Sequence, residues 1–234
     1  MLEIAHMGGL TSCLSVILHE VSKYHAQHGH WPEAIDASKS FITCKDRSDQ
    51  NLAAQLLDQS YRPDMPYLHF DHGMQYADYY KLDLKALQRI AASYAWPSPR
   101  VGDMAFNISQ ARAGRTCVLY RGNDKATEVA PTPYDKMFEA AKNVGGPYIV
   151  LTDELEFFEA FADRFPNTIS VPGSKMIPRN TSKVVTGGSA FAVHFLASLY
   201  SFANANKLIT TAGNTGLWPV IWRGTSMNVW QVRP

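Results

Sequence analysis

A charged segment follows an apolar run in the middle of the chain. Residues 116–120, Thr-Cys-Val-Leu-Tyr, predict a buried strand. Four charged residues come after it: Arg121, Asp124, Lys125 and Glu128. In open α/β sheets ligands bind beyond the carboxyl ends of the strands, so the basic residues suit a diphosphate and the acids suit proton transfer. A solvated charged turn is the alternative interpretation.

A second segment of this kind lies near the C-terminus. Residues 210–216, Thr-Thr-Ala-Gly-Asn-Thr-Gly, connect an expected strand at 207–210 to an apolar helix that begins at Asn214 or Thr215. Small residues at such a turn allow a phosphate to approach free backbone N–H groups at the positive end of the helix. We therefore expect Gly213, Asn214 and Thr215 to bind phosphate. The alternative is that Asn214 or Thr215 is only the N-cap of the helix.

Two further strand ends carry candidate residues. Gly8 and Gly9 follow a short apolar strand at 2–5 and could bring the backbone close to a substrate, although the residues by themselves favour a simple tight turn. Asp153 and Glu154 follow the expected strand at 148–151, where carboxylates can hold sugar or ribose hydroxyls. There the alternative is an Asp153 N-cap, with Glu154 favoured by the helix dipole.

The sequence lacks two common metal-binding patterns. After His19-Glu20, position 23 is lysine, so the H-E-x-x-H motif fails, and the chain contains no Asp-x-Asp. We expect no metal ion and no cofactor.

Charge and cysteine content narrow the classes of protein. Lys and Arg total 22 against 21 Asp and Glu, a formal net charge of +1, so no nucleic-acid partner is expected. Three scattered cysteines without a C-x-x-C favour a reducing compartment. With neither a signal peptide nor a membrane-spanning run, the sequence predicts a cytoplasmic protein without a transmembrane segment.

Strands and helices are expected to alternate along the chain, as in α/β folds. In the first part, helices are expected from residue 11, at 48–57 and at 73–92, with a second strand at 32–36. Trp-Pro-Ser-Pro at 96–99 predicts a break and a connection between lobes. The remainder predicts a parallel Rossmann-like lobe, with helices at 134–142, 154–165 and 189–204 and a strand at 168–171. The expected division is 1–112 and 113–234.

Taken in order, these segments resemble the peptide motifs of the α1,6-fucosyltransferase and nodulation fucosyltransferase superfamily. The resemblance rests on residues 121–128, 150–154, His194-Phe195-Leu196 and 213–215, within a region spanning 116–218. Residues 5–13 and 212–218 also look like virus and bacterial glycosyltransferase-like proteins of that group.

The resemblance implies a compact GT-B-like fold, with two facing Rossmann-like lobes and the donor nucleotide on the C-terminal lobe. Arg121 would match the arginine on the leaving β-phosphate, and Glu128 would match a glutamate proposed as the catalytic base. Asp124 and Lys125 would keep an Asp-Lys pair near the donor, where Asp153 and Glu154 replace paired acids. Gly213, Asn214 and Thr215 take the place of phosphate-binding serines.

Two positions depart from that family. Gly122 stands where the family has a second basic residue, and Ala192 stands where it has an aspartate that reads guanine. These departures bear on the donor base and on fucose as the sugar.

The function expected from these arguments is inverting, metal-independent transfer of a sugar, fucose as first guess, from a nucleotide diphosphate-sugar to a glycan or glycolipid hydroxyl. A GDP-sugar is the first candidate donor and a UDP-sugar the second. The first lobe would shape the acceptor side through Gly8, Gly9, His72, Gln75 and Tyr76. The alternative is a non-catalytic sugar-nucleotide or glycan-binding module, one domain of a larger enzyme.

Overall fold

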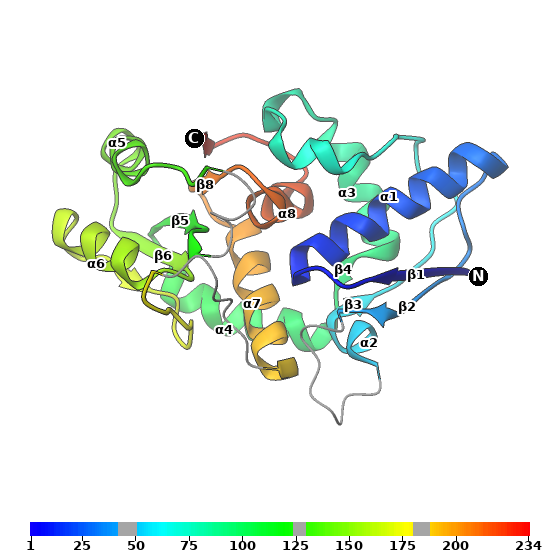
Figure 1. Cartoon of the computed structure of the whole chain (residues 1–234), viewed down its shortest axis with the longest axis horizontal. Coiled ribbons are helices and arrows are strands. Elements are labelled where there is room, and N and C mark those ends of the chain that lie inside the picture. The colour runs from blue at the N-terminus through cyan, green and yellow to red at the C-terminus, as the bar shows by residue number, and fades with distance from the viewer. Residues whose placement is uncertain (42–50, 124–129, 180–187) are drawn as a thin grey trace.

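A computed structural model describes residues 1–41, 51–123, 130–179 and 188–234 (Figure 1). Its main sheet has five strands: β5 (Thr116–Tyr120), β6 (Tyr148–Thr152), β7 (Ile169–Ser170), β8 (Leu208–Thr211) and β9 (Val229–Val232). All neighbouring strands are parallel, in the order β7-β6-β5-β8-β9. The chain therefore moves outward from β5 to one edge, returns, and builds the other edge from β8. This is the strand order of a Rossmann-like sheet, and its switch point lies between β5 and β8.

Alternating side chains of the strands support a helical layer on each face of this sheet. On β5, Val118 and Tyr120 pack in one apolar cluster and Cys117 and Leu119 in another. The first cluster contains residues of α5 (Tyr134–Val144) and α6 (Leu155–Arg164), and the second contains residues of α7 (Gly188–Ala203) and α8 (Asn214–Arg223). Every residue of β5 and β6 is buried, as a sheet covered on both faces requires.

The N-terminal half contains two smaller sheets among its described residues. β1 (Leu2–His6) pairs in parallel with β2 (Ile35–Ser40), and β3 (Leu57–Asp58) pairs antiparallel with β4 (Trp96–Pro97). The helices of this half are α1 (Leu10–His28), α2 (Leu52–Leu56), the 3-10 turns η2 (His72–Tyr76) and η3 (Tyr79–Lys81), α3 (Leu84–Tyr94) and α4 (Pro99–Arg112). Together with α5 to α8, the described residues contain eight α-helices, and the fold is of the α/β class.

The expected helix at 73–92 is wrong over its first half. Asp71 accepts a hydrogen bond from the Gly73 amide (2.6 Å) and Asp83 accepts one from the Ala86 amide (3.0 Å). These carboxylates start η2 and α3 as separate elements, because short acidic side chains favour turns and N-caps over helix interiors.

The expected break at 96–99 is confirmed, because α3 ends at Tyr94 and β4 occupies Trp96–Pro97, but the helix that follows from Pro99 was not expected. Ser98 is the N-cap of α4, its hydroxyl accepts from the Val101 amide (3.4 Å), and Pro99 occupies the first helical position. Proline is favoured at that position because its missing N–H has no helical partner there.

Two strands also differ from the expectation. The second strand begins at residue 35, later than expected, and β9 was not predicted.

One apolar cluster joins the two halves of the chain. It contains residues of β1, α1, α3 and α4 together with residues of α7, α8 and the main sheet, and α4 packs along α7. The division at 112/113 and the arrangement as two facing Rossmann-like lobes stay predictions. No helix within the described ranges combines the length and apolar character needed to cross a membrane.

Candidate functional site

A cavity of about 270 Å³ opens beside the switch point of the main sheet. It is lined by His6, Gly8, Gly9, Thr11, Ser12, His72, Gln75, Arg121, Thr211, Ala212, Gly213, Asn214 and Thr215. These residues come from the β1–α1 turn, η2, the end of β5 and the β8–α8 turn. The cavity therefore brings four of the five expected acceptor-side residues together with Arg121 and the expected phosphate-binding turn.

The β8–α8 turn is built by a glycine and by contacts to the N-terminal half. Gly213 is the N-cap of α8 with φ 125°, a conformation that favours glycine, and no side chain caps the helix. The Asn214 side chain instead accepts from the Ser15 hydroxyl (2.7 Å), and Thr215 Oγ1 lies 3.2 Å from Thr11 Oγ1. The alternative of an Asn214 or Thr215 N-cap is therefore wrong.

The backbone N–H groups at the start of α8 are the hydrogen-bond donors that an anion bound there would contact. Gln75 already accepts two of them: its carbonyl from the Gly213 amide (2.9 Å) and its Oε1 from the Asn214 amide (3.1 Å). The next two amides, of Thr215 and Gly216, belong to the first helical turn and have no carbonyl four residues earlier within the helix. Together with the helix dipole they favour a negatively charged group.

Gly216 sets how closely α8 approaches the end of β8. A Cβ at this position would lie 2.0 Å from the Thr211 carbonyl oxygen and 2.6 Å from Thr210 Oγ1. The glycine thus holds the N-terminus of α8 against the strand end, the role of the packing glycine in phosphate-binding βα turns.

Asp153 pairs with Arg121 outside the lining of the cavity. Arg121 Nη1 lies 2.8 Å from Asp153 Oδ2, and Asp153 Oδ1 accepts from the Gly122 amide (3.0 Å). The side chain of Asp153 is 7% exposed and that of Arg121 23%. A solvated charged turn is therefore wrong for residues 121–123, and the geometry gives Asp153 the role of orienting the guanidinium.

Glu154 contacts the same turn, residues 121–123, through its side chain. Its buried carboxylate accepts from the Asn123 amide (3.2 Å) and from the Tyr134 hydroxyl, and Arg179 Nε lies 3.5 Å away. A Cβ on Gly122 would meet Glu154 Oε2 at 1.7 Å, which explains why the chain has no side chain at that position. Glu154 is itself the N-cap residue of α6 by backbone position, so the Asp153 N-cap alternative is wrong.

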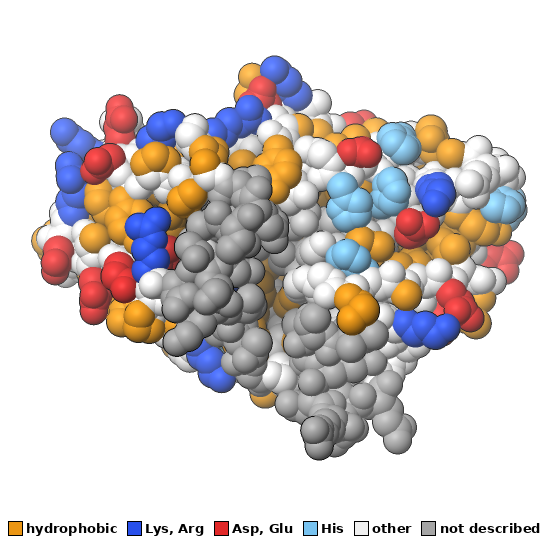
Figure 2. Space-filling view, viewed as in Figure 1, with side chains coloured by type: hydrophobic (Ala, Val, Ile, Leu, Met, Phe, Trp, Pro, Cys, Tyr) orange, Lys and Arg blue, Asp and Glu red, His pale blue; other side chains and the backbone are white. Residues whose placement is uncertain are grey.

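Two histidines supply the ionisable groups on the N-terminal side. His6 Nε2 lies 2.9 Å from the Ser12 hydroxyl, and burial lowers the pKa of the His6 imidazole. Burial also lowers the pKa of His72, with a further contribution from nearby His19 and His6. Both rings are therefore neutral near pH 7 and can accept a hydrogen bond or a proton. In the view of Figure 2, histidine side chains gather over the N-terminal half of the chain, around α1.

His6, Thr11, Ser12 and Thr211 were not among the expected site residues. The first three belong to the segment 5–13, and only their position beside a strand-to-helix turn could have signalled a site. Thr211 and Ala212, which was likewise not among the expected site residues, directly precede the expected phosphate-binding residues 213–215.

Tyr76 is the fifth residue expected on the acceptor side. Tyr76 does not line the cavity; its ring is partly exposed and its carbonyl accepts from Arg233 (2.9 Å). Asp124, Lys125 and Glu128 lie outside the described residues. Among the described residues no three His, Cys, Asp or Glu side chains are grouped to hold a metal ion.

Comparisons with known proteins identify a similar fold. No protein-family model matches the sequence, and no curated protein matches it. The structure is similar to the crystal structure of NodZ α1,6-fucosyltransferase co-crystallised with GDP, with a TM-score of 0.56 and 11% sequence identity over 97% of this chain and 92% of that chain. The chain therefore has a fucosyltransferase-like α/β fold, while sequence comparison gives no evidence for the family.

Proposed function

We propose that the chain is a glycosyltransferase that moves a sugar from a nucleoside diphosphate-sugar to a hydroxyl of a glycan or glycolipid. The observation that carries the proposal is the cavity at the switch point, which Arg121 and the start of α8 line together with His6, Ser12 and His72. A cation and a helix N-terminus on one wall suit a diphosphate. Small polar groups on the other wall suit a sugar hydroxyl.

The fold comparison supports the same class of reaction. The similar structure is that of a fucosyltransferase co-crystallised with GDP. A nucleoside diphosphate is therefore the first ligand to test.

The proposed reaction is a single displacement. The acceptor oxygen attacks the anomeric carbon as the bond from that carbon to the phosphate oxygen breaks, which inverts the configuration. The acceptor proton passes to a base, proposed to be Glu128, and the diphosphate leaves with its charge stabilised by Arg121 and the first-turn amides of α8. Asp153 keeps the guanidinium in place, and Lys125 with Asp124 is proposed to act beside it.

The position of Ala192 bears on which nucleotide base the donor carries. Ala192, at the position where the family has a guanine-reading aspartate, is fully buried in the core. That position therefore offers no polar contact to a base. GDP remains the first donor nucleotide to test and UDP the second.

Calorimetry with GDP, UDP and dTDP in EDTA tests the metal-free diphosphate site, with NAD as the control nucleotide. We expect GDP, or failing that UDP, to bind without a divalent ion because Arg121 and the helix amides replace metal bridging. Binding that appears only after Mg²⁺ or Mn²⁺ is added would contradict the metal-free site. Binding of a nucleotide-sugar without transfer to any glycan would favour the alternative, a non-catalytic sugar-nucleotide-binding module.

A further inference from the structure

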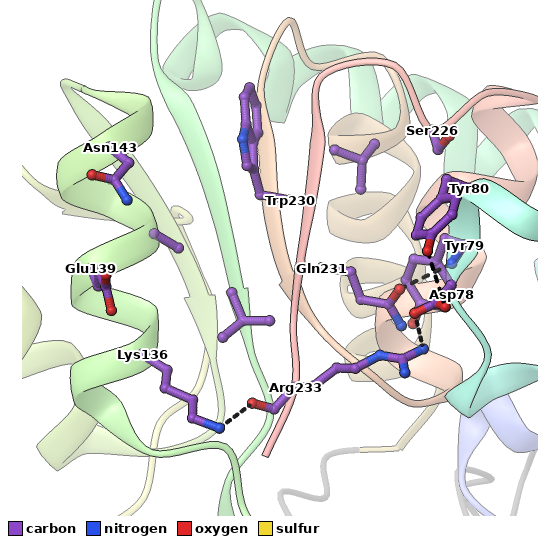
Figure 3. A pocket seen from close by; sticks show the side chains of 13 residues that line it. Asp78, Tyr79, Tyr80, Lys136, Glu139, Asn143, Ser226, Trp230, Gln231 and Arg233 are labelled. Carbon is purple, nitrogen blue, oxygen red and sulfur yellow. Dashed lines mark hydrogen bonds and ion pairs between the residues drawn. The ribbon is translucent and has the colours of Figure 1, made fainter.

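A second cavity, of about 600 Å³, lies at the edge of the main sheet between α5, β9 and η3 (Figure 3). It is lined by Asp78, Tyr79, Tyr80, Lys136, Glu139, Ala140, Asn143, Ser226, Val229, Trp230, Gln231, Val232 and Arg233. Its volume is within the ~300–1,000 Å³ usual for small-molecule sites. We call it the β9 groove.

One polar stripe of α5 forms a wall of the β9 groove. Lys136, Glu139, Ala140 and Asn143 follow the spacing that places residues on one helix face, and all four line the groove. Ala140 leaves room between the longer side chains. The side chains of Glu139 and Asn143 make no hydrogen bond to any described residue, so their donors and acceptors are available to a ligand.

Trp230 provides an apolar surface inside the groove. Its side chain stands between β9 and α5 (Figure 3), is 37% exposed, and belongs to neither apolar cluster of the fold. Tyr80 also lines the groove, on the other side of β9 (Figure 3), and is 70% exposed. Large aromatic side chains normally contribute to the core, so two exposed rings in one groove indicate a binding surface.

The charges of the β9 groove balance one another. Lys136 and Arg233 oppose Asp78 and Glu139, and Arg233 Nη2 lies 2.7 Å from Asp78 Oδ1. This balance disfavours phosphate-bearing ligands and strongly charged peptides. A neutral sugar chain fits it, because each pyranose ring has a face of C–H groups that can lie on an indole and an edge of hydroxyls that can bond to Glu139 and Asn143.

We propose that the β9 groove binds a neutral oligosaccharide, with Trp230 as the surface on which a sugar ring stacks. In the context of the proposed function, on which this step rests, that oligosaccharide is the distal part of the acceptor glycan. The substrate would then be an extended sugar chain.

The segment 72–81 connects the groove to the candidate functional site. Its first turn, η2, lines the site and its second, η3, lines the groove. The buried Tyr79 hydroxyl donates to the Gly213 carbonyl (3.2 Å), while Gln231 on β9 bonds to the Tyr79 amide (3.0 Å) and the Ala77 carbonyl (2.9 Å). A glycan in the groove therefore lies beside the wall of the cavity where transfer is proposed.

Cellohexaose, chitohexaose and mannohexaose are suitable probes, titrated without nucleotide by calorimetry and tryptophan fluorescence. We expect at least one to bind saturably. In Trp230→Ala its affinity should fall by about tenfold or more, since a central aromatic anchor carries much of such binding energy. Phe106→Ala is the matched control, because Phe106 is 67% exposed on α4, away from the groove. Tyr80→Ala, at a more exposed ring, provides a second variant if Trp230→Ala does not fold.

Three results would overturn the proposal: no hexasaccharide binds at millimolar concentration, the Trp230 and Tyr80 variants bind as the parent does, or sedimentation shows that Trp230 is covered in a dimer that Trp230→Ala dissociates. Hexasaccharide binding without any nucleotide binding would refute the proposed transferase and leave the groove as a sugar-binding site. Nucleotide binding without hexasaccharide binding would do the reverse.

Discussion

Arg121→Ala removes the one cation among the described residues that line the candidate site. The guanidinium is held by Asp153 at 2.8 Å and lies at the carboxyl end of β5. Its loss should have two effects, on diphosphate affinity and on the stability of the fold, because the same side chain faces the cavity and neutralises a buried acid.

The size of each effect follows from these contacts. A charge-assisted hydrogen bond to a diphosphate contributes ~1.5–3 kcal/mol, so the dissociation constant should rise roughly 10- to 150-fold. The Asp153 carboxylate, 7% exposed, keeps its bond from the Gly122 amide but loses its counter-charge. Because Arg121 itself is partly exposed, we expect a loss of about 1–3 kcal/mol in unfolding free energy, below the full cost of breaking a buried pair. For a chain of this size that corresponds to a fall of roughly 2–12 °C in Tm.

Calorimetry with GDP and thermal unfolding separate the two effects when three variants are compared. Adding Asp153→Asn to Arg121→Ala removes the uncompensated charge, so stability should largely return while affinity stays low. Arg115→Ala is the matched control: Arg115 precedes β5 at the opposite end of the strand and bonds to the Asn167 carbonyl (2.7 Å). Its loss should leave GDP affinity unchanged.

A folded Arg121→Ala protein that binds GDP as tightly as the parent would refute the assignment of Arg121 to the diphosphate. Equal loss of affinity in Arg115→Ala would refute the location of the site at the carboxyl ends of the strands.

Three further predictions concern other parts of the site. Glu128→Gln should keep diphosphate binding but slow sugar transfer by ~10²–10⁴-fold, the usual contribution of a general base; transfer near the parental rate, measured by product mass, would remove Glu128 from the mechanism. Gly216→Ala should lower the unfolding free energy by ~1–3 kcal/mol, because its Cβ would overlap a β8 carbonyl, whereas Gly9→Ala, with open space around its Cβ, should unfold near the parental temperature. Because burial lowers the pKa of His6 and His72 below the ordinary value of about 6.5, the unfolded chain takes up protons first and stability should fall as the pH drops below about 6.5. A His6→Asn/His72→Asn protein should show a smaller fall in Tm between neutral and mildly acidic pH; an identical fall would contradict the assignment.

The C-terminal half of the fold follows closely from its sequence. Runs such as 116–120 and 148–152 are apolar except for one terminal threonine and are followed by Arg121 and Asp153, which makes strands buried on both faces easy to recognise. The edge strand β9 is harder to recognise, because Gln231 interrupts its short apolar run and only Val232 is buried.

The N-terminal half was less predictable because its local signals have two meanings. Tyr76, Tyr79 and Tyr80 fit one face of a helix by spacing, yet Tyr79 is buried and bonds to the β8–α8 turn while Tyr80 is exposed. Likewise, Ser98-Pro99 can end one element or begin another. Tertiary contacts decide between these meanings, and local sequence does not contain them.

Individual residues of the cavity lining were predicted better than their arrangement. Arg121 and Gly213 could be recognised from strand-end position alone. The contacts that join the two halves, such as Ser15 with Asn214 and Thr11 with Thr215, link residues about two hundred positions apart and have no local signature. The role of Asp153 as a partner of Arg121 likewise appears only once β5 and β6 are adjacent.

Gln75 occupies the helix start that a diphosphate would use. Its two carbonyl oxygens already accept from the Gly213 and Asn214 amides, so an incoming phosphate must exchange with Gln75 or bind to the amides that follow. If it exchanges, η2 loses two of the bonds that fix it to α8. Nucleotide binding and the order of η2 would then be coupled. A bound nucleotide would loosen η2, and a glycan that restrains η2 would weaken nucleotide binding by the same factor.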